Sequence, residues 1–311
     1  MTYKTFIADA ITRLSDVYPL GEAKVIANRV LMYYLKISEY EYLVDPNIII
    51  PKSKVKEMEL AMDQLVDSRP IQYVLGYEFF AGHKFKVNET VLIPRPETEE
   101  LFRIIREDYK KDKYSELKIL DACTGSGCLA YSLASAFPKS MVVGLDKFDD
   151  VLEIAKNQKI YQKNDKSSDN KHPKLIDNPP IFVKYDLLAG PPEIEDLKYH
   201  NNFPEIRDLD ILVSNPPYVM ESEKEVMNNN VVLYEPDAAL FVPDKDPLKF
   251  YKALADWAAK FLKVGGRAYF EINEALGTPV KALYEKKGFS DVEILQDMHK
   301  KNRFVRFTKW F

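Results

Sequence analysis

The sequence predicts an α/β protein in which a mostly parallel seven-stranded sheet follows a small all-helical domain. Apolar residues recur at helical spacing through the first quarter of the chain. Strands and helices then alternate from about residue 117 onward, and a glycine-rich turn joins the first of these strands to a helix. A chain of 311 residues is long enough for both domains.

Residues 1–76 are expected to form the helical domain. Apolar residues at helical spacing fall in three stretches, 6–14, 25–35 and 55–65. Residues 77–96 change in character and read as a short hairpin that turns at Ala81-Gly82, followed by a linker stiffened by two prolines. A helix is expected to begin next, with Glu97, Glu99 and Glu100 in a solvated first turn favoured by the helix dipole.

Residues 97–311 are expected to form the second domain, because alternation of strands and helices is typical of a parallel sheet covered on both faces. The seven expected strands are residues 117–121, 141–146, 181–186, 209–214, 267–272, 292–295 and 304–308. Helices are expected over 129–136, 151–158 and 248–262. The polar stretch 163–178 reads as a surface insertion without a role in the core.

Composition narrows the class of protein. The formal net charge is -4, which gives no support for a protein that binds phosphate backbones, so no direct nucleic-acid contact is expected. The two cysteines, Cys123 and Cys128, cannot close a tetrahedral zinc site, and no metal is expected. No signal peptide and no membrane span is visible, so the expected location is the cytoplasm.

The glycine-rich turn lies between the strand 117–121 and the helix 129–136. Its sequence is Asp121-Ala122-Cys123-Thr124-Gly125-Ser126-Gly127, and glycines let a ligand approach the backbone closely. The next strand ends at Asp146, where a carboxylate can bind the hydroxyl groups of a ribose. Both features also fit a dinucleotide fingerprint, so they indicate a nucleoside-containing cofactor, either S-adenosylmethionine or NAD.

The segment Asn215-Pro216-Pro217-Tyr218 directly follows the apolar strand 209–214, at the end of the sheet where open α/β folds bind ligands. Proline lacks an N–H, so the carbonyls here are free to accept hydrogen bonds. An asparagine oxygen and a proline carbonyl match the two donors of a planar NH2 group, and Tyr218 offers an aromatic face for stacking. A second copy, Asn178-Pro179-Pro180, follows no apolar strand and precedes Ile181, so a structural role is expected for it.

With these motifs, the chain resembles the amino-group and amide methyltransferases of class I, which have a Rossmann-like fold. Two further segments, residues 93–99 and 234–241, are similar to the HemK/PrmC family of release factor glutamine N5-methyltransferases, as is the helical domain ending at residues 69–76. The resemblance covers essentially the whole chain. It implies methyl transfer from S-adenosylmethionine, leaving S-adenosylhomocysteine, to the glutamine of the Gly-Gly-Gln motif of a class I release factor.

The resemblance also assigns residues. It implies that the cofactor contacts Cys123, Thr124, Gly125, Ser126, Gly127, Asp146, Asp186, Leu187 and Asn215. It places catalysis and substrate binding at Asn215, Pro216, Pro217 and Tyr218. Arg95 and Glu97 are candidates either for substrate contact or for fastening the two domains. The helical domain, which carries no chemistry of its own, is expected to recognise the partner protein.

Three alternatives remain open on the sequence. A glutamine on a ribosomal protein would suit the same loop. So would the exocyclic amine of adenine, although a nucleic-acid enzyme would need a basic groove or a target-recognition domain that the sequence does not show. A cofactor-binding module that has lost catalysis is the third, and the intact segment from Asn215 to Tyr218 argues against it.

Overall fold

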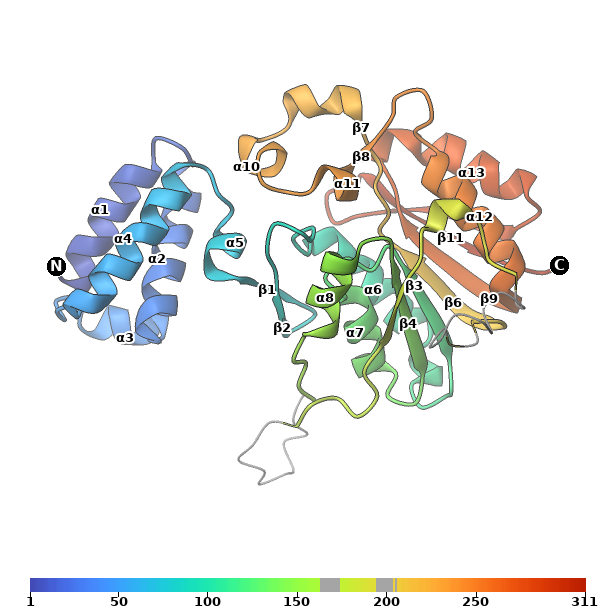
Figure 1. Cartoon of the computed structure of the whole chain (residues 1–311), viewed down its shortest axis with the longest axis horizontal. Coiled ribbons are helices and arrows are strands. Elements are labelled where there is room, and N and C mark those ends of the chain that lie inside the picture. Colours follow the sequence, from blue (N-terminus) through green and yellow to red (C-terminus); the bar gives the residue numbers. More distant parts are fainter. Residues whose placement is uncertain (163–173, 194–203, 205) are drawn as a thin grey trace. The chain divides into compact units, whose positions relative to one another are not determined.

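The computed structural model describes residues 1–162, 174–193, 204 and 206–311 (Figure 1). Within these residues the chain divides into two compact units. The helical unit comprises Met1–Tyr77 and Met227–Tyr234, and the sheet unit comprises Glu78–Val226 and Glu235–Phe311. Among the described helices, none is long and apolar enough to cross a membrane.

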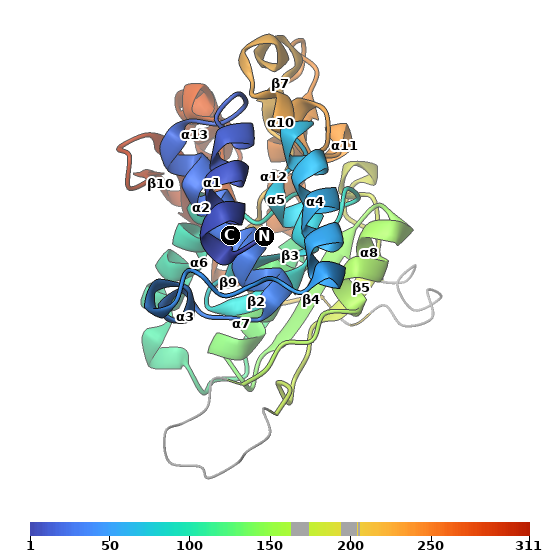
Figure 2. The ribbon, with the colours of Figure 1, turned by 90° about the vertical axis from the view of Figure 1, so that its left-hand side faces the viewer.

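The helical unit is built on the three apolar stripes. Its helices are α1 (Tyr3–Leu14), α2 (Leu20–Leu35), α3 (Glu39–Val44), α4 (Lys52–Val66), α5 (Ile71–Leu75) and α10 (Asn229–Val232). A capping box between Thr2 and Thr5 starts α1. Helices α1, α2 and α4 lie side by side (Figure 2), and their apolar faces form one buried cluster that contains Phe6, Val30 and Leu65. The predicted all-helical domain is therefore confirmed as a fold.

Residues 227–234 also belong to the helical unit, although they follow the Asn-Pro-Pro-Tyr segment in the sequence. The hydroxyl of Tyr234 donates to the carbonyl of Asp67, at 2.8 Å. The sequence pattern of this segment does not predict that it leaves the sheet unit, because the contact joins positions 167 apart.

The sheet unit contains the predicted seven-stranded sheet, in the order β10-β11-β9-β6-β3-β4-β5. These strands are β3 (Lys118–Ala122), β4 (Met141–Asp146), β5 (Ile181–Lys184), β6 (Leu209–Ser214), β9 (Leu262–Glu271), β10 (Ser290–Gln296) and β11 (Asn302–Thr308). Strand β11 runs antiparallel to both of its neighbours, and the other pairings are parallel. Strand β5 ends two residues earlier than expected, and β9 begins five residues earlier.

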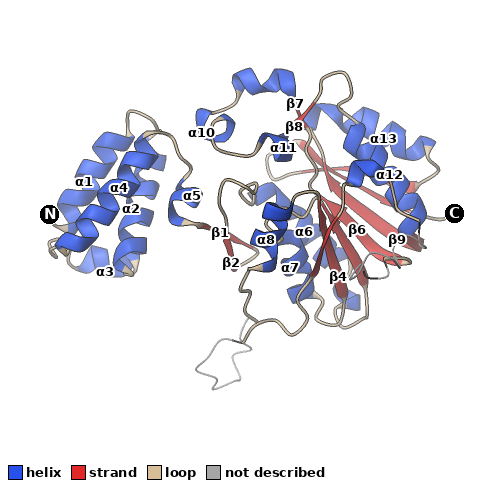
Figure 3. Ribbon diagram, viewed as in Figure 1, coloured by secondary structure: helices blue, strands red, loops and turns tan. Residues whose placement is uncertain are grey.

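Helices cover both faces of this sheet (Figures 1 and 3). They are α6 (Pro96–Asp108), α7 (Cys128–Ala136), α8 (Asp149–Lys156), α12 (Lys249–Phe261) and α13 (Gly277–Lys286). A further short helix, α11 (Asp237–Leu240), follows the part of the chain that belongs to the helical unit. Successive side chains of a strand point to opposite faces, so Ile119 packs with α6 and α7, while Leu120 packs with α12 and α13. This alternation produces two separate cores, one on each face.

The short elements connect these layers. The predicted hairpin is confirmed as β1 (Tyr77–Phe80) and β2 (His83–Lys86), with positive φ angles at Ala81 and Gly82 in the turn. Strands β7 (Val219–Met220) and β8 (Phe241–Val242) form a second small sheet. Short 3-10 helices are η1 (Lys110–Asp112), η2 (Leu187–Ala189), η3 (Glu221–Val226) and η4 (Glu274–Leu276).

Two expectations from the sequence are wrong. The acidic turn of α6 is not merely solvated, because Glu99 accepts the N–H of Ala81 at 2.9 Å and Glu100 accepts that of Met298 at 3.1 Å. Of the expected insertion 163–178, residues 163–173 lie outside the described part of the chain. Within the remainder, Ile176 packs against the core that holds α6 and α7, so this stretch does contribute to the core.

Candidate active site

The parallel strands β3, β4 and β6 end at the same edge of the sheet, and a cavity of about 270 Å³ opens there. It lies within the sheet unit. Three polar residues line it: Asp121 near the end of β3, Asp146 at the end of β4 and Asn215 directly after β6. This is the position at which open α/β sheets bind ligands, so the cavity is the candidate active site.

The glycine-rich turn forms one wall of the cavity. Cys123, Gly125 and Gly127 all have positive φ angles, of 59°, 55° and 79°. A Cβ on Gly127 would lie 3.0 Å from the ring of Phe182. Glycine is therefore favoured at this position both by the positive φ angle and by the close packing. The turn ends at Gly127, which caps α7, and it exposes the backbone between β3 and α7 to the cavity.

Asp121 is a fully buried carboxylate on this wall. Its Oδ2 accepts the hydroxyl of Thr124 at 2.6 Å and the N–H of Ala130 at 3.2 Å. Its Oδ1 is buried and has no hydrogen-bond partner among the described residues. Burial raises the pKa of Asp121 to about 7. This oxygen is a buried acceptor that lacks a partner and borders the cavity. It is therefore available to a polar or cationic group of a ligand.

Asp146 at the end of β4 faces the same cavity. Its Oδ2 accepts the N–H of Gly125 at 3.0 Å, so the turn and the second strand are directly joined. Burial raises the pKa of Asp146. Farther along this wall, Asp186 pairs with Lys147 at 2.9 Å, and the backbone carbonyl of Leu187 accepts the indole N–H of Trp257 at 3.3 Å.

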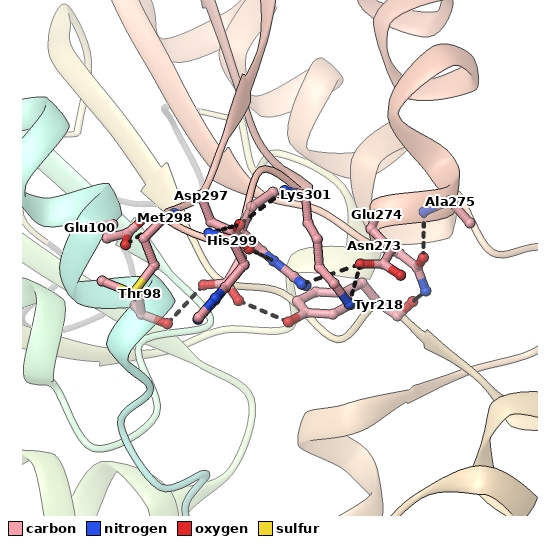
Figure 4. A network of polar contacts seen from close by, with 12 residues as sticks. Thr98, Glu100, Tyr218, Asn273, Glu274, Ala275, Asp297, Met298, His299 and Lys301 are labelled. Carbon is pink, nitrogen blue, oxygen red and sulfur yellow. Dashed lines mark hydrogen bonds and ion pairs between the residues drawn. The ribbon is translucent and has the colours of Figure 1, made fainter.

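The Asn-Pro-Pro-Tyr segment follows β6, and its Tyr218 belongs to a polar network that also includes Thr98 and Asn273 (Figure 4). Asn215 donates from its Nδ2 to the hydroxyl oxygen of Thr98 at 2.9 Å. The hydroxyls of Thr98 and Tyr218 donate to the two oxygens of Glu271, at 2.7 and 2.8 Å. Asn273 donates to the carbonyl of Tyr218 at 3.2 Å, so both ends of the segment are fixed.

The cavity gathers most of the residues expected at the site. Those that line it are Arg95, Cys123, Thr124, Gly125, Ser126, Asp146, Asp186, Leu187, Asn215 and Pro217. Four others, Glu97, Gly127, Pro216 and Tyr218, do not line it. Lining the cavity is a position and not a role, so the roles expected for all of these residues stay predictions.

Arg95 forms an ion pair with the buried side chain of Glu235. The second oxygen of Glu235 accepts the N–H of Ile93 at 3.2 Å. Both partners lie in the sheet unit, so this ion pair ties the linker before α6 to the segment before α11 inside that unit.

The two cysteine thiols lack the lowered pKa of a nucleophilic cysteine. Burial raises the pKa of the Cys123 thiol and that of the Cys128 thiol, to about 12 for Cys128, so both sulfurs are held in the neutral form. Among the described residues, no group of three or more His, Cys, Asp or Glu side chains is arranged to hold a metal ion.

Sequence reasoning missed Thr98 and Glu271. Thr98 lies in the segment 93–99 that suggested the resemblance, but no property of that segment points to Asn215. Glu271 was detectable in principle. It ends an apolar strand that runs parallel to β6, so its carboxylate had to lie at the same edge of the sheet as Asn215.

Comparison with known proteins shows which family the chain belongs to. No family model matches the chain. A release factor glutamine methyltransferase of Bacteroides thetaiotaomicron is 35% identical over 292 residues, which are 94% of this chain and 95% of that protein. One from Flavobacterium psychrophilum is 33% identical over 307 residues, covering 98% of this chain and 99% of the relative. One from Lactococcus lactis subsp. lactis is 36% identical, covering 82% and 84%.

These relatives align with both units of the chain, including the helical unit. Their identity of a third or more, spread over nearly the full length, exceeds what a shared fold alone accounts for. The chain therefore belongs to the family of release factor glutamine methyltransferases.

Proposed function

We propose that the cavity binds S-adenosylmethionine and that Asn215 presents to it the side-chain amide nitrogen of a glutamine in a class I release factor. The enzyme is thus a protein-glutamine N5-methyltransferase, with S-adenosylhomocysteine as its second product. The glutamine is expected in the Gly-Gly-Gln motif of the release factor. Such a substrate places the reaction in the cytoplasm, where translation ends.

The residues of the cavity suit this cofactor. Its positive φ at Gly125 and the open space where a Cβ would point allow a ligand to lie against the backbone. Asp146 supplies a carboxylate for ribose hydroxyls, and the free Oδ1 of Asp121 is an acceptor for a cationic group. When bound, the cofactor would supply a methyl group carried on a positively charged sulfur, and the carboxylates that line the cavity would favour binding of that charge.

The proposed role of Asn215 is to make the amide nitrogen of the substrate glutamine more nucleophilic. An amide nitrogen is a poor nucleophile, because its lone pair is delocalised into the carbonyl group. Hydrogen bonds from its two N–H groups to Asn215 Oδ1 and to the carbonyl of Pro216 would favour a pyramidal nitrogen and aim its lone pair at the methyl group. As the N–C bond forms and the S–C bond breaks, the nitrogen becomes positively charged, and its proton is lost to solvent afterwards, so no base has to act before the attack. Holding the reactants in line supplies much of the acceleration.

The helical unit is proposed to recognise the release factor. It exposes large apolar side chains, among them Val25 on α2 and Leu60 on α4, each more than half exposed. Replacing both with serine in the full chain should raise the KM for intact release factor while leaving methylation of a short Gly-Gly-Gln peptide unchanged. An unchanged KM for the intact protein would contradict this role for these two helices.

The observation that carries the proposal is the position of Asn215 in the same cavity as the glycine-rich turn and Asp146. The test is methyl transfer from labelled S-adenosylmethionine to purified release factor, followed by mass spectrometry of the modified peptide. Label on the Gly-Gly-Gln glutamine that is lost in Asn215→Ala supports the proposal. Label on a ribosomal protein or on adenine instead would assign one of the alternative substrates.

A further inference from the structure

The side-chain amide of Asn215 can adopt two orientations that differ by a half-turn and fill the same space. One turns Oδ1 toward the cavity and the other turns the NH2 group toward it. Packing cannot distinguish them, because the oxygen and the nitrogen are nearly equal in size. The residues that form hydrogen bonds with the Asn215 amide must therefore determine whether its oxygen or its nitrogen faces the substrate.

The hydrogen-bond partner of Asn215 is Thr98, a buried residue in the first turn of α6 that also lines the cavity. Its hydroxyl oxygen lies 2.9 Å from Asn215 Nδ2 and 2.7 Å from Glu271 Oε2. A hydroxyl has one hydrogen to donate, whereas its oxygen has lone pairs to accept. The direction in which Thr98 points its hydrogen thus sets what it offers to Asn215.

Glu271 determines that direction. The side chain is fully buried at the end of β9, and each of its oxygens receives one hydroxyl, from Thr98 or from Tyr218 (Figure 4). An ionised carboxylate only accepts hydrogen bonds. Burial raises the pKa of Glu271, while these two hydroxyls and the charge of Arg303 favour the ionised form. In this arrangement both hydroxyls donate to Glu271, so the hydrogen of Thr98 points to Glu271 and its lone pairs face Asn215.

A lone pair facing Asn215 selects the NH2 side of the amide and leaves Oδ1 on the opposite side. No donor among the described residues meets Oδ1. From this chain of contacts, we infer that Thr98 and Glu271 are positioning residues, which fix the rotation of Asn215 so that its oxygen faces the substrate amide. This inference rests on the proposed function, in which Asn215 Oδ1 accepts an N–H of the glutamine.

The flipped orientation would place the NH2 group of Asn215 against the NH2 group of the substrate. Two donors cannot form a hydrogen bond, and their partial positive charges repel each other. Removing the hydroxyl of Thr98 while keeping its shape therefore removes the selection and lowers the fraction of enzyme that can hold the substrate amide.

The first part of the test compares two variants of Thr98. Thr98→Val keeps the branched shape without the hydroxyl, and Thr98→Ser keeps the hydroxyl without the methyl group. Thr98→Val should slow single-turnover methyl transfer to release factor at least tenfold, with the affinity for S-adenosylmethionine unchanged by calorimetry. Thr98→Ser should retain most of the rate. In a 15N-labelled sample without substrate, the side-chain NH2 signals of Asn215 should shift in Thr98→Val and remain near their positions in Thr98→Ser.

A double-mutant cycle separates positioning from a structural role. If Thr98 acts through Asn215, adding Thr98→Val to Asn215→Ala should slow the residual rate no further. Glu271→Gln is a second variant of equal size. Its amide can donate to Thr98, which frees the hydroxyl to donate toward Asn215 and favours the flipped orientation. It should therefore slow transfer as Thr98→Val does.

The outcomes are distinguishable. A normal rate in Thr98→Val alongside an inactive Asn215→Ala would overturn the inference and leave the proposed function intact. An equal fractional loss from Thr98→Val with and without Asn215→Ala would also overturn it, because Thr98 would then act elsewhere. Normal methylation by Asn215→Ala itself would overturn the proposed function.

Discussion

The chain contains Asn-Pro-Pro twice, and the two copies have different surroundings. Asn215 follows the buried strand β6, lines the cavity and donates to Thr98, which in turn donates to the buried Glu271. Asn178 stands three residues before β5 and donates to the backbone carbonyl of Ser140. The first copy thus has a directed side chain with a free oxygen at a cavity, while the second fastens a loop to the backbone.

The electrostatic surroundings differ in the same way. Of the carboxylates near the first copy, Asp121 and Glu271 are buried and Asp146 is partly buried, and burial raises the pKa of each. The carboxylate beside the second copy, Asp177, is exposed, and its hydrogen bond with Lys174 lowers its pKa. The three shared residues therefore do not by themselves make a site. The site arises where a buried strand delivers them among buried acceptors.

The largest expected difference between the copies is in activity. Asn215→Ala should lower kcat by a factor on the order of 100 to 1000, the usual loss for one preorganised hydrogen-bonding group in an active site. Asn178→Ala should leave kcat within about twofold, because its side chain only meets the carbonyl of Ser140. Single-turnover methyl transfer by both purified variants checks this. Equal losses would mean that the surroundings do not distinguish the two copies.

A second experiment examines the turn beside the first copy. Gly127→Ala places a Cβ 3.0 Å from Phe182 at a φ of 79°, a strain of about 1–2 kcal/mol. Because the turn shapes the cofactor wall, the Kd for S-adenosylmethionine should rise about tenfold. Gly288→Ala, at a φ of 92° away from the cavity, is the matched control and should leave that Kd unchanged. Calorimetric titration measures both, and an unchanged Kd in Gly127→Ala would contradict the role of the turn.

A third experiment compares Asp121, whose pKa is raised in the fold, with Asp177, whose pKa is lowered. The pKa of Asp121 is raised in the folded state, so its contribution to stability is present at low pH and is lost as pH rises from about 4 to about 7. The free energy of unfolding of the parent protein minus that of Asp121→Asn should therefore fall across this range and level off above it. Urea denaturation at several pH values gives this difference.

Asp177→Asn is the comparison for the third experiment. Its folded pKa is lowered, so its contribution is present above the unfolded value and is lost as pH falls through the folded value. The difference between the parent and Asp177→Asn should thus be flat from about pH 4 to 7 and decrease only below about pH 4, with a smaller size because Asp177 is fully exposed. A pH-independent difference for Asp121→Asn would show that Asp121 is already ionised in the fold.

The smallest expected effect is on the stability of the second copy. Asn178→Ala removes one hydrogen bond to the carbonyl of Ser140 and should lower the free energy of unfolding by about 0.5–1.5 kcal/mol. Urea denaturation at pH 7 measures it. A loss several times larger would mean that Asn178 supports more than this loop.

Much of the fold could be predicted because its signals are local. The three apolar stripes of the helical unit, the alternation that gives the seven strands and the turn at Ala81-Gly82 all depend on residues close together in the sequence. The cofactor wall was also predictable, since a glycine-rich turn after one parallel strand and a carboxylate after the next must meet at one edge of the sheet.

The sequence by itself therefore determined the layers of this protein, the edge of the sheet that holds its cavity and the segment that faces it. Only the tertiary structure decided how Asn215 is oriented, because Thr98 lies 117 positions from Asn215 and 173 positions from Glu271. It also decided that residues 227–234 join the helical unit. Hydrogen bonds between residues so far apart in the chain form only after packing has brought their strands and helices together, and no local pattern encodes them.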